Sequence, residues 1–86
     1  MTTEEKKATY EILNRGEYAD YVIINRHTTY LPYVACYAFD YSDYTWGQGY
    51  YFGTYSDALV FMYEKEKDAL EGIIRLMEMN QADVEE

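Results

Sequence analysis

Aromatic residues crowd into one stretch of this chain, residues 30–53, which reads YLPYVACYAFDYSDYTWGQGYYFG. It holds seven of the twelve tyrosines, the only Trp, the only Pro and the only Cys. Its only charged residues are Asp40 and Asp43. Aromatic and β-branched side chains favour strands, and each large ring can bury about 150–250 Å². The stretch therefore predicts two strands with a polar connection, around which the rest of the chain packs.

Three strands are expected in all, over residues 19–27, 31–40 and 45–53. The first strand contains the segment ADYVIINR, which is rich in Val, Ile and Tyr. Pro32 fits near the start of the second strand, where its missing N–H removes no hydrogen bond between strands. Short connections join them, as in an antiparallel meander with the second strand in the centre. The polar residues 40–44 form the second turn.

Alternation along these strands predicts one aromatic face and one small-residue face. The small face, with Cys36, Ala38, Gly47 and Gly49, offers the closest approach to a helix. We therefore expect the C-terminal helix to dock there and leave the aromatic face open. The aromatic face would carry Tyr33, Tyr37, Trp46, Tyr50 and Phe52.

A short N-terminal helix is expected over residues 3–14, because Thr2 and Glu5 have capping-box spacing and good helix formers follow. Asn14-Arg15-Gly16 supplies a C-cap signal. The alternative is that residues 9–14, TYEILN, form an edge strand that leads into a turn at Gly16.

A long C-terminal helix is expected over residues 56–79, with Ser56 as N-cap and residues 80–86 as a fraying acidic tail. Glu66 falls inside its apolar face, and we expect this carboxylate to meet a Tyr hydroxyl or to mark an irregularity. The chain is thus predicted to be a single α+β domain over residues 1–86. The residues of the docking face follow the 3.6-residue period and are Leu59, Met62, Tyr63, Leu70, Ile73, Ile74 and Met77.

Catalytic, metal and cofactor motifs are not evident in the sequence. His27 has no carboxylate near it in sequence, and Cys36 sits mid-strand as a small hydrophobe would. Gly47-Gln48-Gly49 lacks the Lys and the helix start of a phosphate loop. We therefore expect no enzyme, no cofactor and no metal site. A single Cys and a polar N-terminus without an apolar run predict a cytoplasmic location and no membrane partner.

The net charge of −9, from sixteen acidic against seven basic residues, argues against direct nucleic-acid binding. The negative charge is complementary to a basic surface on a partner protein. Glu64, Asp68, Glu71 and Glu78 fall on one face of the expected C-terminal helix, interrupted by Arg75, which we expect to pair with Glu71. One interpretation is a solvated helix face. The other is that these residues, with Asp40 and Asp43, imitate a phosphate backbone.

The open aromatic face suggests a second contact surface, unless the N-terminal helix covers it. Large exposed aromatic patches mark interfaces with other proteins or between copies of one chain. A homodimer that buries this face is one alternative. A small-ligand or nucleotide-sequestering domain with a Tyr/Trp pocket is another.

In size, acidity, aromatic richness and lack of catalytic motifs, the whole chain resembles the small anti-CRISPR and anti-restriction proteins of phages and mobile elements. The resemblance implies a non-enzymatic inhibitor in the host cytoplasm. Such a protein binds a nucleic-acid-handling defence effector and blocks its DNA or RNA site. The sequence contains no motif that identifies the target.

Overall fold

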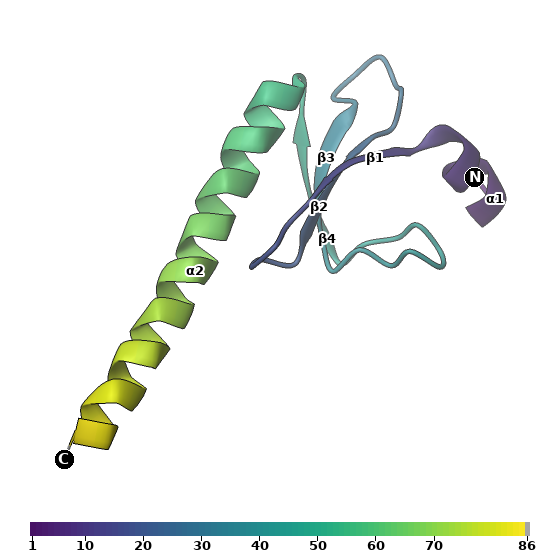
Figure 1. Cartoon of the computed structure of the whole chain (residues 1–86). Helices are drawn as coiled ribbons and strands as arrows, with labels where there is room; N and C mark the ends of the chain where they lie inside the picture. Colours follow the sequence, from purple (N-terminus) through teal and green to yellow (C-terminus); the bar gives the residue numbers. More distant parts are fainter. Residues whose placement is uncertain (86) are drawn as a thin grey trace.

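The computed structural model describes residues 1–85, and the side chains of residues 1–79. It is an α+β fold in which a short N-terminal helix precedes an antiparallel sheet, and a long C-terminal helix packs against that sheet (Figure 1). The sheet has four strands in the order β1-β2-β3-β4, so the expectation of three strands was wrong by one. The elements are α1 (Thr3–Thr9), β1 (Glu11–Arg15), β2 (Tyr21–Asn25), β3 (Tyr33–Tyr37), β4 (Gln48–Phe52) and α2 (Tyr55–Glu85).

The N-terminal segment divides into a helix and a strand. Thr2 caps α1 as predicted: its Oγ1 accepts a hydrogen bond from the N–H of Glu5 at 3.2 Å, and Glu5 reaches back to the cap. The helix ends at Thr9 rather than at residue 14, because Tyr10 is already extended. The alternative of an edge strand in this segment is the one observed, since Glu11–Arg15 pairs antiparallel with β2. Pairing with a buried neighbour outweighs the helical C-cap signal at Asn14-Arg15-Gly16.

Alternation along the two central strands places side chains on both faces of the sheet. Val22 and Ile24 of β2 point to one face with Val34 and Cys36 of β3, and Ile23 points to the other. All five are buried. In β1, Ile12 joins the first face and Leu13 the second, as successive residues of a strand do. The register shifts between Ile12 and Asn14, so a bulge leaves Leu13 without a partner in β2.

The helix α2 covers the opposite face from the one expected. It packs over Ile23 and Ala35, where its own Ala58 and Met62 are buried. The aromatic rings of Tyr33, Tyr50 and Phe52 pack beside the helix, whereas strand alternation predicted that they would be open to solvent. The small residues needed for close approach are Ala35 and Ala58, not the Cys36–Gly49 set. The rings and chains that flank this contact are Leu13, Tyr21, Tyr33, Tyr50, Phe52, Tyr55, Leu59 and Phe61.

The other face of the sheet is closed by the β3–β4 connection and the N-terminal segment. Phe39 and Trp46 stack with their ring planes 12° apart, and Tyr10 packs against the Trp46 ring at 6.2 Å. Strand alternation predicted both rings on the same face as Tyr33 and Tyr50, which is the face that α2 covers. The prediction fails because both rings lie in the connection between β3, which ends at Tyr37, and β4, which begins at Gln48. Within this connection Ala38 and Tyr44 take left-handed φ values of 56° and 55°, so the alternation of the strands does not continue through it.

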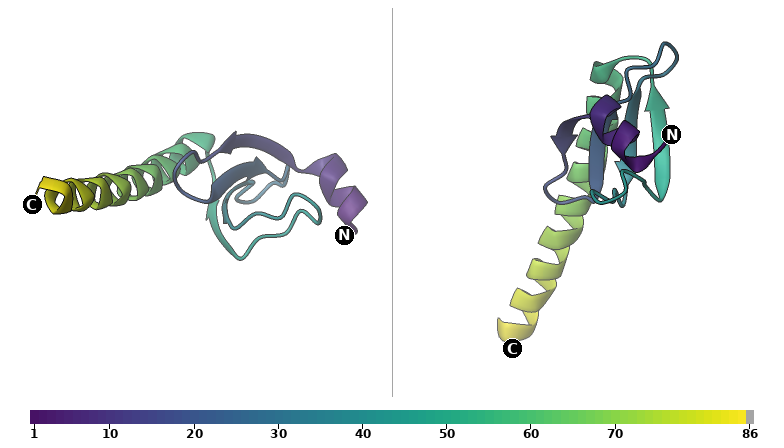
Figure 2. Two further views of the ribbon diagram at one scale, coloured as in Figure 1. Left: turned by 60° about the horizontal axis from the view of Figure 1, so that its bottom comes forward. Right: turned by 90° about the vertical axis from the view of Figure 1, so that its right-hand side faces the viewer.

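The helix α2 extends well beyond the sheet. Thr54 caps it in place of Ser56, accepting a hydrogen bond from the N–H of Asp57 at 3.2 Å. From Glu71 to Met79 every side chain is exposed. The radius of gyration is 16.4 Å, whereas a compact chain of this length would have about 12 Å. Figure 2 shows the distal part of the helix projecting away from the sheet.

Candidate functional site

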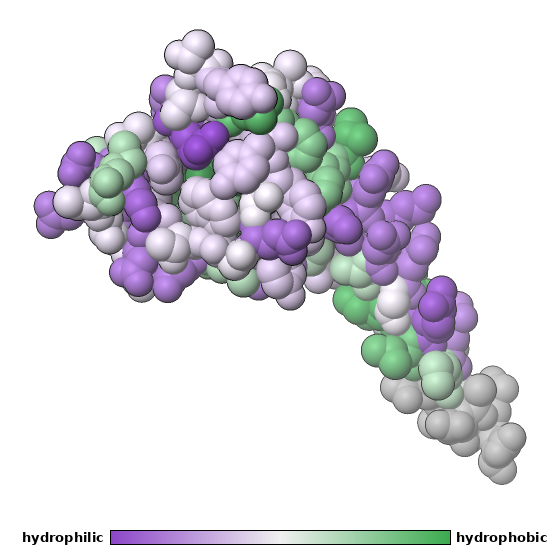
Figure 3. Space-filling view, turned by 180° about the vertical axis from the view of Figure 1, so that it is seen from behind, coloured by the Kyte–Doolittle hydropathy of each residue, from purple (hydrophilic) through white to green (hydrophobic). Residues whose placement is uncertain are grey.

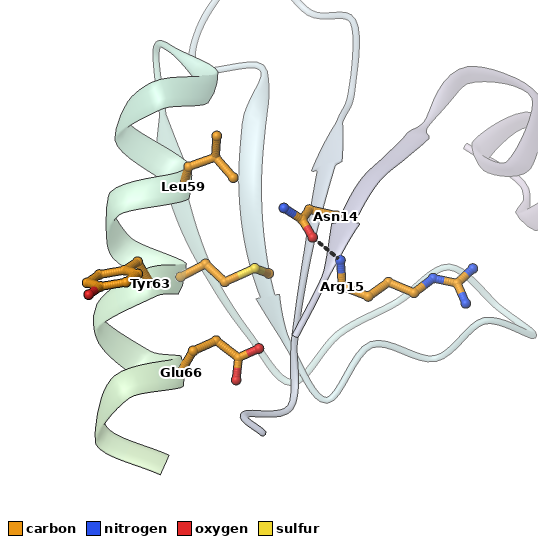
Figure 4. Close-up of a pocket in the computed structure, with 6 residues that line it drawn as sticks. Asn14, Arg15, Leu59, Tyr63 and Glu66 are labelled. Atoms are coloured by element: carbon orange, nitrogen blue, oxygen red, sulfur yellow. Dashed lines mark hydrogen bonds between the residues drawn. The ribbon is translucent and has the colours of Figure 1, made fainter. Parts of the chain in front are cut away.

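The carboxylate of Glu66 anchors α2 to the turn between β1 and β2. The backbone N–H groups of Glu17, Tyr18 and Ala19 all donate to it, those of Tyr18 and Ala19 to Oε2 at 2.7 and 2.8 Å. Figure 4 shows Glu66 pointing from α2 toward this turn. The expected Tyr hydroxyl is therefore not the partner. Three convergent N–H groups form a cradle for one carboxylate, and that fixes the point at which α2 leaves the sheet.

The pKa of Glu66 is lowered from its ordinary value of 4.5. Partial burial by itself would raise the pKa, but the three N–H groups favour the charged form more strongly. Glu66 is therefore a structural anion at neutral pH. It does not belong with the acidic residues that face solvent.

A groove opens between α2 and the edge strand β1. Its volume is about 360 Å³, and it lies beside the Glu66 anchor (Figure 4). Tyr63 borders it from the outer side of α2 and is 69% exposed. A smaller cavity of about 190 Å³ follows along the helix and is bordered by Tyr18, Tyr63 and Leu70. The groove is lined by Asn14, Arg15, Leu59, Met62, Tyr63 and Glu66.

The acidic residues predicted on α2 share one exposed face of the helix. Glu64, Asp68, Glu71 and Glu78 are all exposed, and their sequence spacing places them on the side opposite Leu59 and Met62. Arg75 lies among them and is exposed. Within the side chains of residues 1–79, the only salt bridge joins His27 to Glu11, so the expected Glu71–Arg75 pair is not formed. We call these four carboxylates the acidic stripe.

Asp40 and Asp43 lie apart from the acidic stripe. Both are exposed in the β3–β4 connection, which Figures 1 and 2 show on the side of the sheet away from α2. The Oδ1 of Asp40 accepts hydrogen bonds from the N–H of Ser42 at 2.8 Å and of Asp43 at 3.4 Å. Asp40 thus shapes its own turn, and a partner that contacts both sites must reach around the sheet.

The five aromatic residues predicted as one surface occupy three environments. Tyr33, Tyr50 and Phe52 are partly buried against α2, and Trp46 packs on the opposite face of the sheet. Only Tyr37 is exposed, with its ring 5.3 Å from that of Tyr21. The continuous open aromatic face expected from strand alternation is therefore not formed.

The two residues considered for chemistry are held in structural settings. His27 Nε2 lies 3.2 Å from Glu11 Oε1, a carboxylate that is distant in sequence. Cys36 is fully buried, and that burial raises its pKa to about 12 although Arg26 opposes the shift. Among the described residues, no three His, Cys, Asp or Glu side chains gather as metal ligands would.

The apolar residues on the distal part of α2 are exposed, although their spacing predicted that they would pack on the sheet. Ile73, Ile74 and Met77 continue the period of Leu59 and Met62, but the sheet does not reach them. The reason is the length of the strands. The observed strands have five residues and span about 17 Å, whereas the predicted strands of nine and ten residues would span about 30 Å. The predicted helix of 24 residues spans about 36 Å. Leu76 and Met79, which the docking face left out, are exposed beside them.

Comparisons with known proteins returned no match: no family model, no curated protein and no solved structure is similar to this chain. None of the helices among the described residues combines the length and apolar character that a membrane crossing requires.

Proposed function

We propose that this protein is a non-enzymatic inhibitor that binds a basic, nucleic-acid-handling surface of another protein through its acidic stripe. The observation that carries the proposal is the position of the stripe. It begins at Glu64, on the part of α2 that packs on the sheet, and continues through Glu71 and Glu78 on the part that projects, with all four carboxylates exposed. A projecting rod of negative charge has the access needed to enter a channel that normally holds a nucleic-acid strand.

The charge spacing supports this use. From Glu64 to Glu78 the helix rises about 21 Å, at 1.5 Å per residue. One strand of DNA carries a charge about every 3.4 Å along the axis, so the stripe offers four charges over the length of about six phosphates. The net charge of −9 adds long-range attraction to a basic target. The resemblance to anti-CRISPR and anti-restriction proteins names the class of target: a defence nuclease or restriction enzyme in the cytoplasm of the host.

Charge reversal tests the proposal. The chain is expressed in cells that carry a CRISPR nuclease or a restriction enzyme, and survival of a targeted plasmid or phage is measured. The variant with Glu64, Asp68, Glu71 and Glu78 changed to Lys is expected to lose protection while its circular dichroism spectrum is unchanged, because all four side chains are exposed. Amide substitutions at the same positions should have a smaller effect of the same sign.

The control is charge reversal at Asp43, which is exposed but lies away from α2. Binding of the parent to the purified effector should also weaken as salt rises, since the Debye length falls from about 10 Å at 0.1 M to about 3 Å at 1 M. Protection by the Lys variant equal to that of the parent, or no protection by the parent against any effector tried, would contradict the proposal.

A second candidate function is favoured by a cavity on the other side of the sheet. Its volume is about 290 Å³, and its walls include Tyr10, Tyr44 and Trp46 beside Lys6. Aromatic walls stack on bases, and an ammonium group attracts phosphate. A nucleotide-sequestering domain would use this site. Trp46 is the only Trp, so quenching of its fluorescence by mononucleotides tests it directly. No quenching at millimolar nucleotide would exclude this candidate.

A further inference from the structure

The apolar surface of α2 continues past the last point at which the sheet covers it. Leu70 is the last apolar side chain of the helix that is partly buried among the described residues. Beyond it, apolar and hydrophilic residues lie side by side along the projecting helix (Figure 3). The exposed apolar residues there are Ile73, Ile74, Leu76, Met77 and Met79, with exposed fractions from 41% to 62%.

A neighbour would stabilise this projecting segment. In proteins, tertiary packing of an amphipathic face supplies most of a helix's stability, and the sheet supplies none beyond Leu70 among the described residues. Gly72 weakens the segment further, and a Cβ at that position would meet nothing within 4 Å. Four or five large apolar side chains on such a segment are the surface on which a second helix packs.

The charged residues beside the apolar surface indicate how a second helix would be oriented against it. At about 100° per residue, Lys67 and Glu78 fall on the same flank of the apolar surface. Along the helix axis, Lys67 precedes Ile74 and Glu78 follows it. The acidic stripe lies on the far side of the helix, apart from Glu78 at its edge. When two identical helices pair antiparallel, the same flank of each copy meets. When they pair parallel, opposite flanks meet, and the Glu78 flank would face the flank that carries the apolar Leu76.

We propose that two copies of this chain pair antiparallel through residues 67–79 of α2. The midpoint between Lys67 and Glu78 lies at Gly72–Ile73, so a two-fold axis there brings Lys67 of each copy to Glu78 of the other. Leu70, Ile73, Ile74 and Met77 fill the seam between the helices. The pairing does not rest on the inhibitor function, although Glu78 takes part in both.

Net charge does not prevent the pairing. Apart from Glu78, which flanks the seam, the acidic stripe of each copy faces away from the partner helix. Each helix is about 10–12 Å across with its side chains, so the stripes lie roughly 20 Å apart. This exceeds the Debye length of about 8 Å at physiological salt. Lys67, the cation beside the seam, is the group placed to offset Glu78.

Light scattering after size-exclusion chromatography of the full chain tests the pairing. We expect a mass twice that of the 10.2 kDa chain at micromolar concentration. The double variant Ile73→Glu/Met77→Glu should have the mass of one chain and an unchanged circular dichroism signal at low concentration, because both side chains are exposed. Val60→Glu is the matched control: Val60 is 59% exposed on the same helix but outside the projecting segment, and this variant should remain a dimer. A parent that is monomeric up to millimolar concentration, or a double variant that stays dimeric, overturns the proposal.

Disulfide trapping separates the two orientations without relying on a disruptive change. Under mild oxidation, Ile73→Cys should give a covalent dimer, because the two residues meet near the axis. Met77→Cys should not, because the antiparallel register separates the two positions by about 14 Å along the axis, beyond the roughly 7 Å limit of a disulfide. Native Cys36 is buried and does not compete. Efficient cross-linking through Met77→Cys would show a parallel pair and contradict the proposal.

Discussion

The carboxylate of Glu66 accepts a hydrogen bond from the backbone N–H of Ala19 at 2.8 Å, across 47 residues of sequence. With the donors from Glu17 and Tyr18, this contact ties α2 to the β1–β2 turn at the point where the helix leaves the sheet. It separates the part of α2 that the sheet covers from the part that projects. The direction in which the acidic stripe and the exposed apolar residues point depends on this anchor.

Replacing Glu66 with Gln should therefore destabilise the fold. An amide keeps one acceptor oxygen, but its NH₂ group would face N–H donors of the turn. Leaving buried or partly buried donors unpaired costs about 1–3 kcal/mol, and we expect a loss of this size in urea unfolding. Glu64→Gln on the exposed face of the same helix is the control and should change little. Equal stability of the two variants would show that the cradle adds nothing.

The same anchor predicts a loss of stability in acid. The pKa of Glu66 is lower in the folded chain than its ordinary value of 4.5. The unfolded chain therefore takes up the proton first as pH falls, and the stabilisation is complete above pH 4.5 and is lost as pH drops through the folded value. Unfolding free energy measured from pH 6 to pH 3 should fall more steeply for the parent than for the Gln variant. Parallel curves would contradict this assignment.

The two glycines Gly16 and Gly72 should respond in opposite directions to Ala. A Cβ on Gly16 would collide with the backbone oxygen of Ala19 and approach the Glu66 carboxylate at 3.2 Å, so the turn must open. A Cβ on Gly72 meets nothing, and Ala is favoured over Gly in a helix interior by about 1 kcal/mol. Thermal unfolding should show a lower Tm for Gly16→Ala and a higher one for Gly72→Ala. A stabilising change at Gly16 would mean that the turn is looser than described.

Local features of this fold could be predicted from the sequence because their causes are local. The Thr2–Glu5 capping box is set by spacing alone, and the buried alternation of Val22, Ile23 and Ile24 follows from the two-residue period of a strand. The length of β1 could not be settled in the same way. Its residues suit either a helix end or an edge strand, and pairing with β2 decides between them.

The face on which α2 docks was beyond local reasoning. The connection with left-handed Ala38 and Tyr44 carries Phe39 and Trp46 to the side opposite the one that alternation predicts, and nothing in these two residue types requires that conformation. The partners of Glu66 are backbone N–H groups, which every sequence contains. The acidic stripe was predictable as one face of a helix, but the extension of Glu71 and Glu78 onto a projecting segment depends on the short length of the strands.

Truncation of Met62 should cost far more stability than truncation of Val60. Met62 is 4% exposed and packs among Ile23, Ala35 and Ala58, whereas Val60 is 59% exposed. Large-to-Ala changes in a core cost about 2–5 kcal/mol. We expect Met62→Ala to fall in that range by urea unfolding and Val60→Ala to stay within about 0.5 kcal/mol, as exposed substitutions do. Similar losses for the two variants would place the docking face of α2 elsewhere.

The thiol of Cys36 should report on opening of the sheet. It is fully buried between β2 and β4, opposite Gly49 in the register, and its pKa is raised to about 12 by burial. Only the thiolate reacts with a disulfide reagent such as Ellman's, so the native chain should react very slowly at pH 8 and the unfolded chain at once. The rate should rise in Met62→Ala and Glu66→Gln by about tenfold for every 1.4 kcal/mol of stability lost, and stay at the parent value in Val60→Ala. Fast labelling of the native parent would show that the central strands are open to solvent, which this packing forbids.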